Sequence, residues 1–239
     1  ITCPLRFFLS YISGLKPDTD PLEGINAPLI GDIFHDTAEI VYKRIIQRPG
    51  SHVIQRNTLA ELLSDMEGLV GPILDIVFDT VYFHPADRWR RSEEAWKMVC
   101  QQARPGNQYT GELIIIRKVL MQYLTNLLRF DMRHTPFRII DTEADKLFNI
   151  KCAALNVKTG GRIDRIDEMD GHIRIVDYKT GNHVPSIKDM SEVTGTAGKH
   201  EGYFLQAFLY SYAVLYGDKP QLPVVPALFY PAKAYQEDY

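Results

Sequence analysis

Hydrophobic residues recur every three or four positions through most of the first 135 residues, which is the spacing of one face of an α-helix. Within residues 31–48, for example, Ile33, Ile40, Val41 and Ile45 fall on one stripe. The pattern predicts helices over the following ranges: 31–48, 57–66, 69–82, 92–103 and 110–132. This part of the chain is therefore expected to be largely helical.

The pattern changes after about residue 135, where short apolar runs replace the helical spacing. Two of these runs flank Asp170-Gly171, a dipeptide typical of tight turns between antiparallel strands. Further ranges are predicted as strands at 137–140, 150–157 and 224–229, a polar loop at 182–200, and a helix at 201–215. Helices, then antiparallel strands, then a helix and a last strand are typical of an α/β domain with a helical insertion.

The predicted hairpin has ionisable side chains where apolar neighbours indicate burial. Asp164 is followed thirteen residues later by Asp177, and Lys179 comes two residues after that. Because side chains alternate along a strand, Asp177 and Lys179 share a face and Tyr178 lies on the other. Carboxylates are hard ligands for Mg²⁺ or Mn²⁺, and a lysine can orient a water or neutralise developing charge. The alternative is a solvated surface ion pair, but charges among buried apolar residues need a reason.

Composition narrows the class of protein. The 239 residues are 45% hydrophobic and 24% charged, as in a folded domain, and no apolar run approaches the ~20 residues of a membrane span. Three widely separated cysteines, Cys3, Cys100 and Cys152, indicate a reducing compartment, so we expect a cytoplasmic protein.

The charge distribution gives no general attraction to nucleic acid, because the net charge is −3. A DNA-binding protein would need a locally basic groove, and two groups could provide one. One group is Arg88-Trp89-Arg90-Arg91, and the other consists of Arg129, Arg133, His134 and Arg138. Ordinary solvated charge explains either group equally well.

Five segments together resemble the RecB/AddB-type nuclease domains of the PD-(D/E)XK nuclease superfamily. The two hairpin segments are Gly161-Arg162-Ile163-Asp164 and Asp177-Tyr178-Lys179. The others are the helical His35 after Gly31-Asp32-Ile33-Phe34, the pair Gln206 and Tyr210 four residues apart, and the opening Cys3-Pro4-Leu5-Arg6-Phe7-Phe8. The resemblance implies a restriction-endonuclease-like α/β core, a mixed central sheet flanked by helices, with a large N-terminal helical portion.

The resemblance also implies an activity, which is divalent-metal-dependent hydrolysis of DNA by an exonuclease rather than an endonuclease, with 5′-phosphate and 3′-hydroxyl products. The catalytic residues would be Asp164, Asp177 and Lys179. His35, Asp164, Asp177 and the backbone carbonyl of Tyr178 would hold Mg²⁺ or Mn²⁺. Gln206 and Tyr210 would contact DNA or support the metal site.

Several neighbouring residues receive lesser roles. Glu143 is expected to support the site rather than bind the ion, Asp36 or Glu39 to orient His35, and Tyr203 to pack on the sheet. Taken alone, His35 would more often be a structural histidine than a ligand. Asp167 is expected on the opposite face from Asp164, where Arg165 or Arg162 could pair with it.

The resemblance covers nearly the whole chain, so we expect one nuclease domain over 1–239, with a helical insertion at about 50–135 and the catalytic sheet and its helix at 136–239. The start at Ile1 inside a motif predicts a piece of a larger helicase–nuclease protein of DNA repair and recombination, with DNA and a helicase as partners. An iron–sulfur cluster is not expected, because no cysteine follows Cys152. The alternatives are a noncatalytic DNA-binding or structural module, or a helical scaffold over 31–132.

Overall fold

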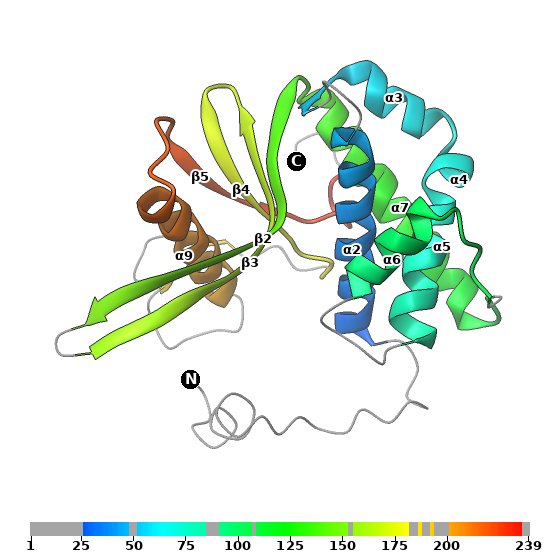
Figure 1. The fold of residues 1–239 in the computed structure, drawn as a ribbon, viewed down its shortest axis with the longest axis horizontal. Helices are drawn as coiled ribbons and strands as arrows, with labels where there is room; N and C mark the ends of the chain where they lie inside the picture. Colours follow the sequence, from blue (N-terminus) through cyan, green and yellow to red (C-terminus); the bar gives the residue numbers. More distant parts are fainter. Residues whose placement is uncertain are drawn as a thin grey trace.

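The computed structural model describes residues 26–47, 52–84, 91–106, 109–152, 155–181, 186–187, 192–193 and 201–235. Helices from the first half of the chain gather on one side, and the sheet with the last helix lies on the other (Figure 1). The helices are α2 (Ala27–Ile46), α3 (Arg56–Ser64), α4 (Met66–Leu69), α5 (Gly71–Phe78), α6 (Arg91–Cys100), α7 (Glu112–Arg133) and α9 (Glu201–Gly217). The predicted helical first half is confirmed.

Two helix boundaries differ from the prediction for local reasons. α2 begins at Ala27 rather than at residue 31, because the side chain of Asn26 accepts a hydrogen bond from the Leu29 amide at 3.1 Å and caps the helix four residues earlier. The range predicted as one helix at 69–82 is divided. After α5 the chain continues as a π-helix over Asp79–Phe83.

The sheet has five strands in the order β1-β2-β3-β4-β5. The strands are β1 (Val53–Ile54), β2 (Phe137–Cys152), β3 (Leu155–Met169), β4 (His172–Tyr178) and β5 (Val224–Phe229). The first four pair antiparallel and β5 pairs parallel to β4, so the sheet is mixed. Asp170 and Gly171 have positive φ values of 50° and 74°, as a tight hairpin turn requires, which confirms the predicted turn.

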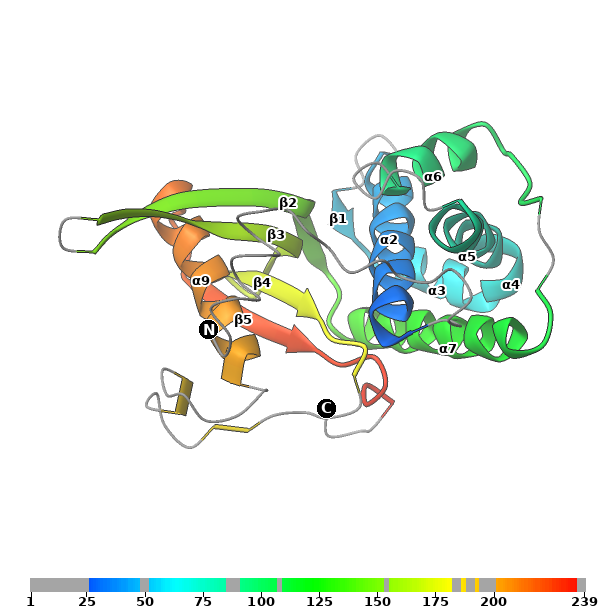
Figure 2. The same cartoon turned by 90° about the horizontal axis from the view of Figure 1, so that it is seen from below.

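The strand predicted at 150–157 was wrong. It spans the end of β2 and the beginning of β3, which pair with each other as far out as Cys152 and Leu155. These two long strands project from the sheet as a two-stranded arm (Figures 1 and 2). The polar residues in the range 141–151 conceal the length of β2, since they lack the apolar alternation that identifies a half-buried strand.

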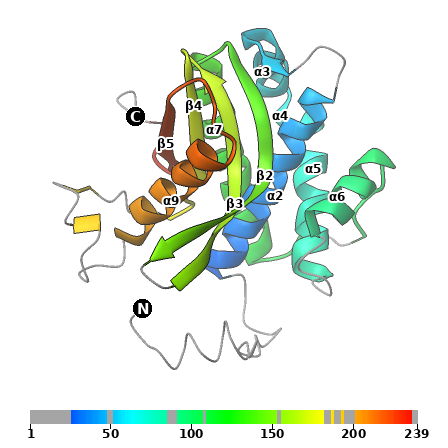
Figure 3. The same cartoon turned by 60° about the vertical axis from the view of Figure 1, so that its left-hand side comes forward.

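Two apolar layers cover the sheet. The larger one joins α2, α5 and α7 to Phe137 and Ile139 of β2 and to Val176 and Tyr178 of β4. The smaller one lies under α9. Its buried residues are Ala144, Ile163, Ile166, Ile173, Ile175, Tyr210 and Val214. The sheet therefore lies between α9 and α2, as Figure 3 shows, in a mixed α/β arrangement consistent with the expected restriction-endonuclease-like fold.

A buried ionic network joins the helices to the sheet. Asp131 of α7 accepts hydrogen bonds from Arg165 of β3 at 2.6 and 3.1 Å and from the hydroxyl of Tyr42 on α2. Arg165 Nε also lies 2.9 Å from Asp167, which binds Arg174 of β4 at 2.6 Å. Arg165 is 2% exposed, and Asp131 and Asp167 are fully buried. The expected pairing of Asp167 with Arg165 is confirmed, and the network fixes α2 relative to β3.

Candidate metal centre

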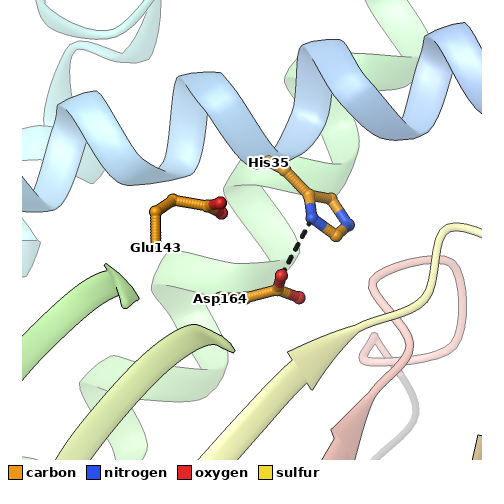
Figure 4. Close-up of side chains that lie close together, drawn as sticks. All are labelled: His35, Glu143 and Asp164. Atoms are coloured by element: carbon orange, nitrogen blue, oxygen red, sulfur yellow. Dashed lines mark ion pairs between the residues drawn. The ribbon is translucent and has the colours of Figure 1, made fainter. Parts of the chain in front are cut away.

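Three residues from three different elements meet at the edge between α2 and the sheet (Figure 4). His35 comes from α2, Glu143 from β2 and Asp164 from β3. One ligand atom from each residue lies within 4.8 Å of the others, and His35 Nδ1 is 3.2 Å from Asp164 Oδ1. One imidazole nitrogen and two carboxylate oxygens form a donor set that suits a divalent cation. The group therefore fits the metal that the sequence analysis expected.

Electrostatics within the group also favour a cation. Burial alone would lower the pKa of the His35 imidazole, but the charge and hydrogen bond of Asp164 raise it to about 9. Burial, followed by the charge of Asp164, raises the pKa of Glu143 to about 8. At neutral pH, protons on His35 and Glu143 therefore offset the carboxylate charge of the group, and a bound metal ion could offset the same charge in their place.

Glu143 reaches the group through an unusual backbone conformation. Its φ is 51°, in the left-handed region that non-glycine residues rarely adopt, at a cost of order 1–3 kcal/mol. Its side chain is 8% exposed. The sequence analysis gave Glu143 a supporting role, whereas this geometry makes it a candidate ligand. The resemblance indicated Glu143 only as a supporting residue, because the strained conformation that brings it to the other ligands leaves no trace in the sequence pattern.

The two aspartates of the hairpin lie side by side. The last residue pair between β3 and β4 is Arg165 with Val176, and Asp164 and Asp177 are the next residues along each strand. Asp164 Oδ2 accepts a hydrogen bond from the Tyr178 amide at 2.5 Å. Burial, followed by the charge of Asp164, raises the pKa of Asp177 to about 6, although Lys179 opposes the shift. Asp177 is next to the three-residue group, but it is not one of its members.

Lys179 is held by several partners at once. Its Nζ lies 2.6 Å from Asp177 Oδ2 and donates to Gln206 Oε1 at 3.0 Å. Gln206 in turn donates to the Tyr210 hydroxyl at 2.8 Å. Tyr203, expected only to pack on the sheet, has its ring centroid 4.8 Å from Lys179 Nζ. The pair Gln206 and Tyr210 therefore belongs to the surroundings of the lysine.

Tyr210 also explains the glycine that opens the first hairpin motif. A Cβ atom added at Gly161 would lie 2.8 Å from the Tyr210 hydroxyl oxygen, closer than real Cβ contacts allow. Glycine at this position therefore lets the Tyr210 ring of α9 lie directly against β3. The first hairpin motif and the Gln206–Tyr210 pair, far apart in sequence, thus depend on each other.

Comparison with known proteins agrees with this arrangement. The family model of the PD-(D/E)XK nuclease superfamily matches residues 1–237. The chain belongs to the PD-(D/E)XK nuclease superfamily. It is 24% identical to the B subunit of an ATP-dependent helicase/deoxyribonuclease from Symbiobacterium thermophilum, over 93% of the chain but 17% of the relative's length. No solved structure matches it.

Membership of the PD-(D/E)XK nuclease superfamily confirms the resemblance read from the motifs, but several predicted details have other outcomes. Glu39, one of the two residues expected to orient His35, forms an ion pair with Lys43. Burial, followed by the charge of Glu39, raises the pKa of Asp36 to about 7. The segment beginning at Cys3 and residues 88–90 lie outside the described residues.

Three of the four residues of the second basic group have contacts within the fold of this PD-(D/E)XK protein. Arg138 pairs with Glu168 at 2.6 Å, and a ring nitrogen of His134 lies 2.8 Å from the Phe130 carbonyl oxygen. Arg133 lies over the Phe130 ring. Arg138 and His134 therefore already have partners within the fold. In the described part of the chain, no helix is long and apolar enough to cross a membrane.

Proposed function

We propose that this PD-(D/E)XK protein is a divalent-metal-dependent nuclease that hydrolyses phosphodiester bonds in DNA. The observation that carries the proposal is the meeting of His35, Glu143 and Asp164 beside the Asp177–Lys179 pair. An imidazole nitrogen and several clustered carboxylate oxygens are ligands that suit a divalent metal ion, and an adjacent ammonium suits the charge of a phosphate.

The residues divide into two sets. His35, Glu143 and Asp164 would hold Mg²⁺ or Mn²⁺, and Asp177 and the Tyr178 carbonyl would complete the coordination. The bound ion would activate a water and stabilise the negative charge that develops on phosphate oxygens. The Tyr178 amide keeps Asp164 Oδ2 in place through its hydrogen bond, so Oδ1 faces His35.

Lys179 would act on the reacting groups rather than on the ion. Asp177 and Gln206 fix the position of its ammonium group, and Tyr203 lies under it. A fixed cation there orients the attacking water and offsets the charge of the transition state. Gln206 and Tyr210 contribute by holding the lysine and by contacting DNA.

We further propose an exonuclease that works with a helicase in the cytoplasm, as one nuclease domain over residues 1–239. The name of the Symbiobacterium relative supports a helicase connection, although the chain spans only 17% of that protein. The second candidate is a noncatalytic DNA-binding module. The complete set of acidic residues, histidine and lysine favours catalysis over this alternative.

The test is cleavage of labelled single-stranded DNA by the purified protein, with Mg²⁺ or Mn²⁺ and with excess chelator. We expect cleavage only with the metal, and none by the Asp164→Ala variant. DNA binding without turnover would support the noncatalytic module. Undiminished cleavage in chelator, equal in wild type and variant, would refute the metal-dependent proposal.

A further inference from the structure

Arg162 lies next to the candidate metal centre but has no part in holding it. It is two residues before Asp164 on β3, so both side chains are expected on the same face of the strand. Its Nε lies 3.0 Å from Glu143 Oε2 and 3.3 Å from the Glu143 carbonyl oxygen. The side chain is 48% exposed. A guanidinium is thus anchored at the rim of the site.

The anchoring leaves one edge of the guanidinium available. Both contacts with Glu143 use Nε, and the terminal nitrogens Nη1 and Nη2 have no hydrogen-bond partner among the residues that the structure describes. Two parallel N–H groups on one edge match two oxygens of a phosphate. An arginine fixed through Nε has also lost much of the rotamer freedom that phosphate binding would otherwise cost.

We propose that Arg162 binds a phosphate group of the nucleic-acid strand at the metal centre, through Nη1 and Nη2. This phosphate subsite rests on the proposed function, because it assumes a phosphodiester substrate. Two residues of β-strand span about 6.6 Å, so the guanidinium can reach the phosphate at the ion or the adjacent one.

Glu143 connects the subsite to the metal centre. A carboxylate has two oxygens, so Glu143 can offer one to a cation while Oε2 keeps Arg162 in place. The strained backbone of Glu143 places its carboxylate between the other two candidate ligands, His35 and Asp164, and Arg162. Metal and phosphate would then be aligned by one side chain.

The experiment uses the full chain with Arg162→Gln, Arg162→Lys and the control Arg138→Gln. Arg138 is a matched control because it is 54% exposed and pairs with a glutamate, Glu168. The affinity for a single-stranded oligonucleotide is measured by fluorescence anisotropy over a range of NaCl concentrations with Ca²⁺ present. Mn²⁺ affinity is measured separately without DNA.

We expect Arg162→Gln to weaken DNA binding about tenfold. The slope of log K against log[NaCl], which is negative, should become less steep by about 0.7, the value for one phosphate contact on a single strand. Arg162→Lys should restore the slope but only part of the affinity, since an ammonium cannot bind two oxygens in parallel. Mn²⁺ affinity should remain within about twofold, and Arg138→Gln should change neither quantity.

Wild-type affinity and slope in Arg162→Gln would overturn the subsite while leaving the proposed nuclease intact. A loss of Mn²⁺ affinity with unchanged DNA binding would show that Arg162 only supports the metal centre, and would also overturn it. A wild-type protein that binds DNA without cleaving it would refute the nuclease but not the subsite. A protein that binds no DNA would refute both.

Discussion

Replacing Asp131 by alanine tests how strongly the buried ionic network holds the fold together. The carboxylate of Asp131 accepts two hydrogen bonds from Arg165 and one from Tyr42, all in a fully buried position. Its removal would leave Arg165, 2% exposed, with Asp167 as its remaining buried counter-charge, and Asp167 is shared with Arg174. Breaking one partner of a buried pair costs about 3–5 kcal/mol.

That cost is large for a domain of this size. Unfolding free energies are typically about 5–15 kcal/mol, and each kcal/mol shifts the melting temperature of such a domain by roughly 2–4 °C. We therefore expect Asp131→Ala to lower the melting temperature by roughly 6–20 °C, measured by circular dichroism, with a matching fall in the urea midpoint. The control is Glu168→Ala at the exposed pair with Arg138, which should change stability by less than about 1 kcal/mol.

A double variant separates the loss of the Asp131–Arg165 ion pair from the cost of leaving Arg165 buried and charged. Asp131→Leu combined with Arg165→Met removes both charges, so this double variant should be more stable than Asp131→Ala alone. The network also fixes α2, on which Tyr42 and His35 are seven residues or about two turns apart. Asp131→Ala should then weaken Mn²⁺ binding as well. A fall in melting temperature of less than about 2 °C would refute the reasoning.

Three further predictions concern the metal centre. Because the pKa values of His35 and Glu143 are raised to about 9 and about 8, a metal must displace their protons at neutral pH; Mn²⁺ affinity measured by calorimetry should rise from pH 6.5 to 9, and a flat profile would contradict this. Lys179→Ala should reduce cleavage by about 10²–10⁴-fold while Mn²⁺ affinity is unchanged, and wild-type turnover would remove its assigned role. His35→Ala should weaken Mn²⁺ binding with little loss of melting temperature. The reverse result would identify a structural histidine, whose loss costs ~1–3 kcal/mol.

The hairpin was predictable because its determinants are local. The turn at Asp170-Gly171 and the two-residue alternation around Asp177 and Lys179 are visible in a short stretch of sequence, and the strands pair as that pattern requires. His35 was different. Nothing in its own helix shows that α2 crosses the sheet edge beside Asp164, so only the resemblance to a family connected the two.

The remaining features depend on long-range contacts that leave little trace in the sequence. Asp131 resembles any acid near the end of a helix, and its burial depends on Arg165 arriving from a strand more than thirty residues later. Glu143 was expected only as a supporting residue, since its place among the candidate ligands follows from a backbone conformation rather than from residue type. The length of the β2–β3 arm was missed because polar residues fill most of it.

The left-handed backbone at Glu143 lowers the stability of the fold, while the carboxylate that it positions is needed for the proposed metal binding. Glycine adopts this conformation without strain, so Glu143→Gly would remove a backbone cost of order 1–3 kcal/mol together with a buried carboxylate whose pKa is raised. A library of variants selected only for heat resistance should therefore accumulate glycine there and become poorer at binding metal. An effort to stabilise this domain by mutation would therefore have to leave residue 143 unchanged in order to keep metal binding.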